Sequence, residues 1–208
     1  MALVLVLWVA VPYFVLQRLP VGPATIMPAT ALERWVPFDE RATWLYLSLF
    51  ALIPLPPLLM ASARQLRQYA LGVACIGLVS NGCFLALPTS IARPDAGASD
   101  AAYRFVLAVD TERNACPSLH ASLAVFTALC GERLLRELAR TGRWRAALWA
   151  WTVAILYATL ATRQHVLADL AGGALVALLA YLATYRRVPA ATALGPPPGG
   201  IALAGGLR

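Results

Sequence analysis

Six apolar runs, separated by polar, proline-rich or arginine-rich segments, constrain the possible folds of this chain more than any other feature. A helix needs about 20 mostly apolar residues to cross the hydrocarbon core of a bilayer. Hydrophobic residues make up 60% of the sequence and charged residues 13%, whereas soluble domains carry about 25% charged residues. We therefore expect an all-α, polytopic membrane protein built as a six-transmembrane-helix bundle. The predicted spans cover residues 1–16, 43–60, 69–87, 117–131, 146–161 and 166–185.

The segments between and within these spans also predict local structure. Pro54, Pro56 and Pro57 indicate a kink or an early end of the second span, because proline lacks the amide hydrogen that a helix needs. Within the proline-rich connector 17–42, residues 32–35 are expected to form a short interfacial helix. The third span contains many small residues, which allow helices to pack closely. The remaining segments 61–68, 88–116 and 132–145 are expected to be polar or basic loops.

The two ends of the chain allow further expectations. Residues 1–16 could be a cleaved signal peptide instead of a span, because the segment 28–31 resembles a small-residue cleavage site. The run has no basic n-region and lies far from that site, which favours a retained span. We expect residues 1–187 to form a single membrane-embedded domain. Residues 188–208 are rich in glycine, proline and alanine and predict a flexible cytoplasmic tail.

The arginines are divided unequally between the two sides that six spans define. The side with both termini and the 61–68 and 132–145 loops carries ten arginines and two glutamates, a charge of +8. The opposite side carries seven arginines and eight acidic residues, a charge of −1, and the two values account for the net charge of +7. The positive-inside rule then places both termini in the cytoplasm, with the protein in the cytoplasmic (plasma) membrane. The basic balance is thereby explained by topology, and no nucleic-acid partner is expected.

The sequence contains only two histidines, and both lie on the predicted extracytoplasmic side where a polar loop meets an apolar run. His120 ends the stretch Pro-Ser-Leu-His that opens the fourth span, and His165 precedes the sixth span. Asp169 follows His165 at the i,i+4 spacing, so on a helix the carboxylate can reach the imidazole. Pro117 and Ser118 indicate a helix start, with the proline in the first turn, whose unpaired amides can bind an anion.

Two imidazoles beside an anion-binding helix end favour phosphoryl transfer. A neutral imidazole can attack phosphorus when a carboxylate holds its tautomer, so His165 with Asp169 is the candidate nucleophile. The departing alkoxide needs a proton, for which His120 is the remaining candidate acid. Charge on the phosphoryl oxygens requires fixed donors. We expect the ring nitrogens of His120 and His165 to face each other across a gap that holds one phosphate, with Arg93 on its rim. The candidates for the phosphate contacts are Arg93, Arg163, the Ser118 hydroxyl and the amides at the start of the fourth span.

These residues resemble the motifs of the type 2 phosphatidic acid phosphatase superfamily. Pro-Ser-Leu-His at 117–120 is similar to its Pro-Ser-x-His motif, and His165-x-x-x-Asp169 to its His-x-x-x-Asp motif. Arg93-Pro94 resembles the Arg-Pro end of its phosphate-binding motif. The resemblance covers about residues 35 to 187. It implies a six-helix membrane fold in which His165 is the nucleophile, Asp169 its partner, His120 the general acid and Arg93 a phosphate ligand.

Two departures from the family pattern affect what is carried over. The position that matches the usual lysine upstream of Arg-Pro is Ala86, and Arg163 stands much closer to the second histidine than the family's arginine does. The role of Arg163 therefore does not follow from the resemblance. The compact motif form is closer to the branch that contains inositol phosphorylceramide and sphingomyelin synthases. That branch transfers phospho-headgroups between lipids, whereas its relatives hydrolyse lipid phosphates.

The sequence thus predicts an integral membrane phosphatase or phosphotransferase that acts on a lipid phosphate or phospholipid at the extracytoplasmic face. The acceptor is water or a lipid or polyol hydroxyl. No acidic cluster suited to Mg²⁺ lies near the histidines, so no metal or other cofactor is expected. The alternative is a catalytically silent lipid-binding or lipid-transport protein on the same fold. A haloperoxidase would share these site residues, but those proteins are soluble. Asn114 is a candidate brace of the loop, and Cys116 is expected to be inert.

Overall fold

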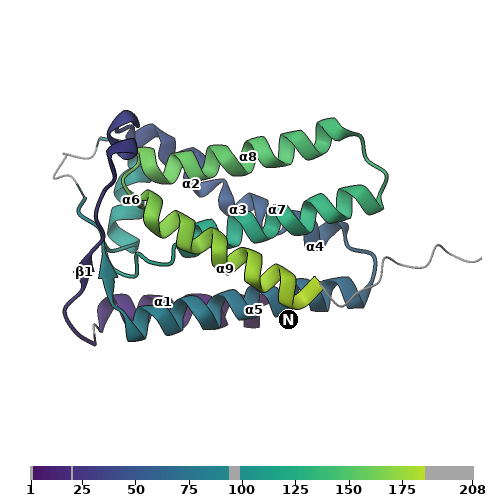
Figure 1. Ribbon diagram of the computed structural model, residues 1–208, viewed down its shortest axis with the longest axis horizontal. Coiled ribbons are helices and arrows are strands. Elements are labelled where there is room, and N and C mark those ends of the chain that lie inside the picture. The colour runs from purple at the N-terminus through teal and green to yellow at the C-terminus, as the bar shows by residue number, and fades with distance from the viewer. Residues whose placement is uncertain (1, 20, 94–98, 186–208) are drawn as a thin grey trace, which may run out of the picture.

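The computed structural model describes residues 2–19, 21–93 and 99–185. The predicted tail 188–208 and Pro94 of the Arg93-Pro94 pair lie outside these residues. Within them, the chain is mostly helical, and its long helices run side by side along one axis (Figure 1). These are α1 (Ala2–Arg18), α5 (Ala63–Ala86), α7 (Leu119–Glu137), α8 (Gly142–Ala161) and α9 (Leu167–Tyr185), together with a broken segment of η2 (Glu40–Ala42), α2 (Thr43–Leu47), α3 (Leu49–Leu52) and α4 (Leu55–Leu59).

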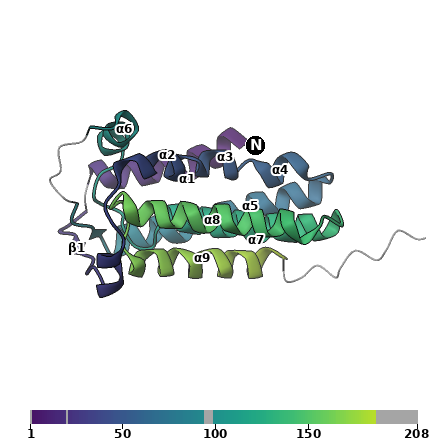
Figure 2. The same cartoon turned by 90° about the horizontal axis from the view of Figure 1, so that it is seen from above.

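Successive segments alternate in direction, so their connections alternate between the two ends of the bundle (Figure 1). The connections after α1, α5 and α8 gather at the end that also holds α6 (Ala101–Val109), β1 (Thr25–Ile26) and β2 (Thr89–Ser90). Figure 2 shows α6 and β1 at this same end from a second direction. The α7–α8 turn lies at the opposite end. Both histidine motifs therefore lie at one end, away from the arginine-rich turn.

Three segments are long and apolar enough to cross a membrane: Glu40–Leu59, Ala63–Ala86 and Leu167–Tyr185. A shorter apolar helix covers Val4–Arg18. The chain forms helices at the other two predicted spans as well, but α7 ends and α8 begins with arginines that lower their hydropathy. Length and composition of the described helices thus support three of the six predicted spans.

The prolines interrupt the second apolar segment as predicted. α3 ends at Leu52, and α4 begins at Leu55 with Pro54 as its N-cap and prolines in its first turn. A proline at the start of a helix removes no hydrogen bond, because the first amides have no intrahelical acceptor. In the interior of a helix it removes one. The segment therefore continues in the same direction as short helices instead of as one straight helix.

Two segments that were predicted as loops are largely helical. α5 begins at Ala63, because the Ser62 hydroxyl accepts from the Gln65 amide at 3.2 Å and the Gln65 carboxamide accepts from the Ser62 amide at 3.2 Å, which forms a capping box. At the other loop, α7 extends to Glu137. Ion pairs at the i,i+4 spacing, both 2.8 Å, stabilise its last turns. They join Arg133 to Glu137 and Arg136 to Glu132.

The expected loop 88–116 also contains regular structure. α6 is capped by Asp100, whose carboxylate accepts from the amides of Ala102 and Tyr103. Its apolar face buries Tyr103 and Val106, and nine residues are too few to span a bilayer. At nine residues, α6 is shorter than the window of about 11–18 residues over which helical periodicity is read, which explains why the loop prediction was wrong.

A small parallel pair of strands qualifies the all-α prediction. β1 and β2 pair Thr25 with Thr89 and Ile26 with Ser90, so they join the connector 17–42 to the segment after α5. Two residues are too short to show an alternating pattern in sequence. The predicted short helix in the connector is present as the 3₁₀ helix η1 (Ala31–Trp35).

Close packing of α7 against α9 sets the position of the histidine motifs. The start of α7 is tied to α9 by a hydrogen bond from the Ser118 amide to the Asp169 carbonyl at 3.0 Å. Gly173 of α9 lies directly against this turn, because a Cβ added there would be 2.4 Å from the Ser118 carbonyl oxygen and 2.9 Å from the Ala121 Cβ. At Gly172 the nearest atom would be the Cys116 sulfur at 3.4 Å, an ordinary contact.

We predict that Gly173→Ala lowers the free energy of unfolding by about 1–3 kcal/mol, because the new methyl group meets backbone atoms that cannot move independently. Gly172→Ala is the matched control, since it has the same change in helix propensity one residue away. Thermal unfolding of the two variants in detergent measures the difference. Equal melting temperatures would show that α7 and α9 are not packed as closely as described.

Candidate active site

Asp169 is the buried centre of the second histidine motif. Its side chain is fully buried, and one carboxylate oxygen lies 3.1 Å from His165 Nδ1 while the other accepts from the Val166 amide at 3.1 Å. His165 stands two residues before α9, so the i,i+4 contact forms at the helix N-terminus and not along the helix face. An ionised carboxylate only accepts hydrogen bonds, so this contact places the proton of a neutral His165 on Nδ1 and leaves Nε2 with a lone pair.

His120 brings the first motif directly to His165. It lies in the first turn of α7, and its Nδ1 is 3.3 Å from His165 Nε2. The expectation that the two imidazoles face each other is confirmed. The expected gap for a phosphate between them is not present, because nitrogens at this separation are in hydrogen-bond contact. Sequence spacing fixes which residues share a helix, but it does not fix the separation of side chains from two helices.

Tyr46 of α2 adds a further contact to the series formed by Asp169, His165 and His120, and this residue was not identified from the sequence. Its hydroxyl lies 2.6 Å from His120 Nε2, and its side chain is almost fully buried. The only sequence signal for this contact is a tyrosine within an apolar run, because a tyrosine that becomes buried there needs a hydrogen-bond partner for its hydroxyl. The second predicted span therefore contributes to the site, although it contains no motif.

Ser118 is the N-cap of α7. Its Oγ accepts from the Ala121 amide at 3.2 Å, and its carbonyl accepts from the Ser122 hydroxyl at 2.8 Å. The side chain is fully buried. α7 begins at Leu119, so Pro117 precedes the cap and is not in the first turn as expected. The cap fixes the turn that carries His120, and contact of Ser118 with a phosphate stays a prediction.

Arg93 lies near the site, but its guanidinium is bound by two backbone carbonyl groups. Its two terminal nitrogens donate to the carbonyls of Asp110 at 2.7 Å and Thr111 at 3.0 Å, just beyond the C-terminus of α6, where a cation is favoured. Its Nε is buried and finds no acceptor in the part of the chain that the structure describes. The guanidinium and the Asp110 carboxylate are close enough to His120 to act on it electrostatically. Phosphate binding by Arg93 remains a prediction.

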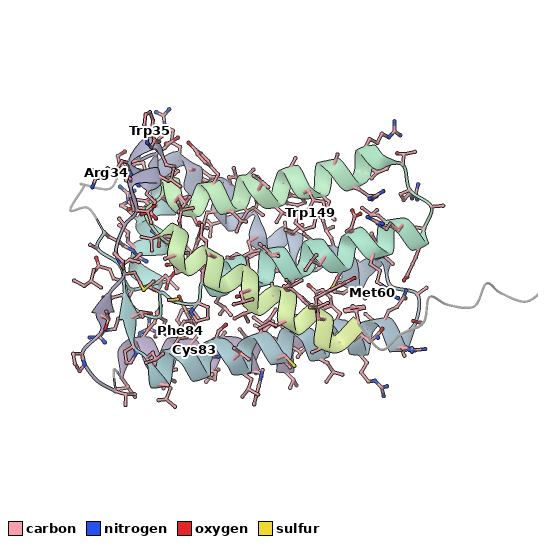
Figure 3. The ribbon with its side chains drawn as sticks, viewed as in Figure 1. Arg34, Trp35, Met60, Cys83, Phe84 and Trp149 are labelled. Carbon is pink, nitrogen blue, oxygen red and sulfur yellow. The ribbon has the colours of Figure 1, made fainter. Side chains whose placement is uncertain are left out.

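Arg163 is turned towards the connector. It has a positive φ of 53°, and its terminal nitrogens donate to the carbonyls of Glu33 at 3.3 Å and Val36 at 2.8 Å. The structure therefore places its guanidinium against η1, and its predicted contact with phosphate stays untested. The end of η1 that it holds carries Arg34 and Trp35, which Figure 3 labels at this end of the bundle.

Glu33 is a second buried carboxylate that sequence reasoning did not single out. It is 4% exposed, its Oε1 accepts from the Leu167 amide at 2.6 Å, and its Oε2 accepts from the Thr30 amide at 3.1 Å. A negative charge at the N-terminus of α9 is favoured by the helix dipole. Together with the contacts of Arg163, it fastens the connector 17–42 to the second histidine motif.

The other two residues singled out in the sequence, Asn114 and Cys116, support the loop and take no visible part in the chemistry. Asn114 braces the loop as proposed: it has a φ of 58°, and its carboxamide donates to the Tyr13 carbonyl at 2.9 Å. Burial raises the pKa of the Cys116 thiol, which keeps it protonated and agrees with an inert side chain. In the described residues, no three His, Cys, Asp or Glu side chains lie together as a possible metal site.

Comparison with known proteins identifies the class. The family model of the PAP2 superfamily matches residues 26–183, which is more than two thirds of the 208-residue chain. The chain therefore belongs to the PAP2 superfamily, a membrane-associated family that generally comprises phosphatases, and its membership indicates phosphatase or phosphotransferase chemistry. No curated protein and no solved structure matched the chain.

We predict that Glu33→Ala lowers the free energy of unfolding by about 1–3 kcal/mol, because it leaves the partly buried Leu167 amide without its acceptor. Glu33→Gln keeps an acceptor oxygen and should lose less. Thermal unfolding in detergent distinguishes the two variants. If both variants have the same melting temperature as the wild type, the connector is not held by this carboxylate.

Proposed function

We propose that the protein is an integral membrane phosphatase or phosphotransferase that acts on a lipid phosphate through a phosphohistidine at His165. The observation that supports this most strongly is the continuous series of contacts from Asp169 through His165 and His120 to Tyr46. The two histidines are 45 positions apart in the sequence and meet at one end of the bundle. Membership of the PAP2 superfamily supports the same chemistry.

One arrangement of protons satisfies every contact in the series. Tyr46 donates to His120 Nε2, which leaves the proton of a neutral His120 on Nδ1, and this proton is donated to the lone pair of His165 Nε2. His165 in turn donates from Nδ1 to Asp169. His165 then holds the form its role requires, with a lone pair on its nucleophilic nitrogen. His120 is neutral in this arrangement and becomes a general acid when it takes up a second proton on Nε2.

The reaction follows from inserting a phosphate between these two nitrogens. The His165 Nε2–P bond forms while the ester P–O bond breaks. His120 must enter this step as the imidazolium, with its Nε2–H donating to the Tyr46 hydroxyl; the departing alkoxide takes its Nδ1 proton and leaves His120 neutral. Asp169 stabilises the positive charge that develops on the His165 ring, as a buried carboxylate does beside an attacking or proton-accepting imidazole. In the second step, water or a lipid or polyol hydroxyl attacks phosphorus, His120 takes its proton, and the Nε2–P bond breaks.

The site must open for this insertion. Attack requires nitrogen and phosphorus about 3–3.5 Å apart, and proton transfer requires about 2.6–3.2 Å between His120 and the leaving oxygen. The two ring nitrogens must therefore separate to more than about 5 Å, from 3.3 Å in the structure. His120 is partly exposed, whereas His165 is 6% exposed and held by Asp169. We infer that His120 is the ring that moves.

The phosphoryl oxygens need donors, and Arg93 is the first candidate. Its buried Nε has no acceptor in the described residues, and its charge lies near His120. Ser118 and the free amides at the start of α7 are further candidates. Arg163 would have to release the carbonyls of Glu33 and Val36 before it could contribute.

We propose the membrane arrangement from the charge distribution. Residues 1–187 form one domain with six spans in the plasma membrane, both termini are cytoplasmic, and the histidines are extracytoplasmic. The support is that the histidine motifs and the arginine-rich α7–α8 turn lie at opposite ends of the bundle (Figure 1). The motif form favours transfer to a hydroxyl acceptor, as in the inositol phosphorylceramide and sphingomyelin synthase branch, over hydrolysis.

We predict that purified protein releases phosphate or transfers a headgroup from a lipid phosphate, and that the activity persists in EDTA. His165→Ala should reduce it to background, and His120→Ala should lower kcat about 10²- to 10⁴-fold, which is the usual share of general acid catalysis. Assays in detergent with a phosphatidic acid and a diacylglycerol acceptor measure both routes. Wild-type protein that binds the lipid without turnover would favour the silent lipid-binding alternative.

We predict that Tyr46→Phe lowers kcat about 10- to 100-fold with little change in KM. The variant removes the donor that sets the His120 tautomer, but it leaves His165 and the phosphate donors in place. Tyr69→Phe is the matched control, because it deletes another buried hydroxyl, one that contacts the Ile53 carbonyl and Thr127. Equal kcat values in the two variants would remove Tyr46 from the mechanism.

A further inference from the structure

A half-open cavity lies at the end of the bundle opposite the histidines. It has a volume of about 170 Å³ and is lined by the start of α5, the end of α7 and the end of α9. Figure 3 labels Met60, which lines it, at this end of the molecule. The polar side chains around it that matter here are those of Arg64, Gln68, Arg133, Glu137 and Tyr185.

The cavity carries a surplus of positive charge. Arg133 is paired with Glu137 at 2.8 Å, and no carboxylate within the described ranges forms an ion pair with Arg64. Arg64 lies in the first turn of α5, where the helix dipole already presents partial positive charge, so a cation there is unfavourable by itself. An anion in the cavity would remove this conflict.

Tyr185 gives an independent indication of a ligand. Its side chain is 6% exposed and lines the cavity, and its buried hydroxyl has no oxygen or nitrogen partner among the described residues; its one hydrogen-bonding neighbour there is the Cys130 thiol. The Arg133 guanidinium lies over its ring at 5.4 Å from the centroid, so a donor and a cation stand side by side. Sulfur is a weak acceptor, so a phosphate oxygen would be a better partner for this hydroxyl than the Cys130 thiol is.

We propose that this cavity binds a phosphate group, with Arg64, Arg133 and the Tyr185 hydroxyl as its donors. A water molecule occupies about 30 Å³ of liquid, so about 170 Å³ has room for a phosphate and its ester oxygen but not for a whole lipid. The phosphate belongs to an anionic phospholipid or is free in solution. Basic pockets between membrane helices on the cytoplasmic side bind such headgroups, and the proposed topology places this end on that side.

The test measures binding to the full chain in detergent and does not depend on catalysis. Melting temperatures and native mass spectra are recorded with phosphatidylglycerol, with phosphatidylcholine and with inorganic phosphate. We expect phosphatidylglycerol to stabilise the wild type, and the apparent Kd to rise at least tenfold in Arg64→Gln. Arg67→Gln is the control, because Arg67 lies on the same helix, is exposed and does not line the cavity.

Tyr185→Phe separates binding from folding. The variant removes a buried hydroxyl whose one hydrogen-bonding neighbour is a thiol, so the lipid-free protein should be about as stable as the wild type while its affinity for phosphatidylglycerol falls. Stabilisation by inorganic phosphate alone, lost in Arg64→Gln, would assign the site to free phosphate. Stabilisation that needs phosphatidylglycerol would assign it to the lipid. Equal stabilisation of wild type, Arg64→Gln and Arg67→Gln by every probe would overturn the proposal.

Discussion

The contact between Asp169 and His165 is the interaction on which the rest of the site depends. A fully buried carboxylate is tolerated only when it is hydrogen-bonded, and here one oxygen takes the Val166 amide and the other takes the imidazole. The same residue, in the first turn of α9, therefore holds the end of the preceding loop and orients the candidate nucleophile. Its carbonyl also accepts from the Ser118 amide, so the turn that carries His120 is tied to the same point.

Several elements that are far apart in the sequence contribute residues to the site around Asp169 and His165. The close approach of α7 and α9 at Gly173 brings the two histidine motifs together, and α2 supplies Tyr46. The connector 17–42, whose role the sequence left open, fastens to the second motif through Glu33. The far end of the bundle carries the arginine-rich α7–α8 turn and the half-open cavity, so the two ends differ in charge as well as in chemistry.

Much of the arrangement could be predicted, because apolar length and polar breaks are local properties. The helices α1, α5, α7, α8 and α9 lie where five of the six spans were predicted, and the broken segment after Glu40 lies at the second predicted span, which contains the prolines. Three of the six segments are long and apolar enough to cross a membrane. The meeting of His120, His165 and Asp169 followed from motif order and side. What could not be predicted depends on contacts between elements: the hydroxyl of Tyr46, the buried charge of Glu33 and the 3.3 Å separation of the imidazoles.

Direct trapping of the covalent intermediate tests the central claim. Protein mixed with a ³²P-labelled lipid phosphate and quenched in alkali, where phosphohistidine persists, is digested and its peptides are analysed by mass spectrometry. The account predicts a single acid-labile phosphoryl group on the peptide that contains His165, and no label in His165→Ala. A label on His120, or turnover without any phosphorylated histidine, would contradict it.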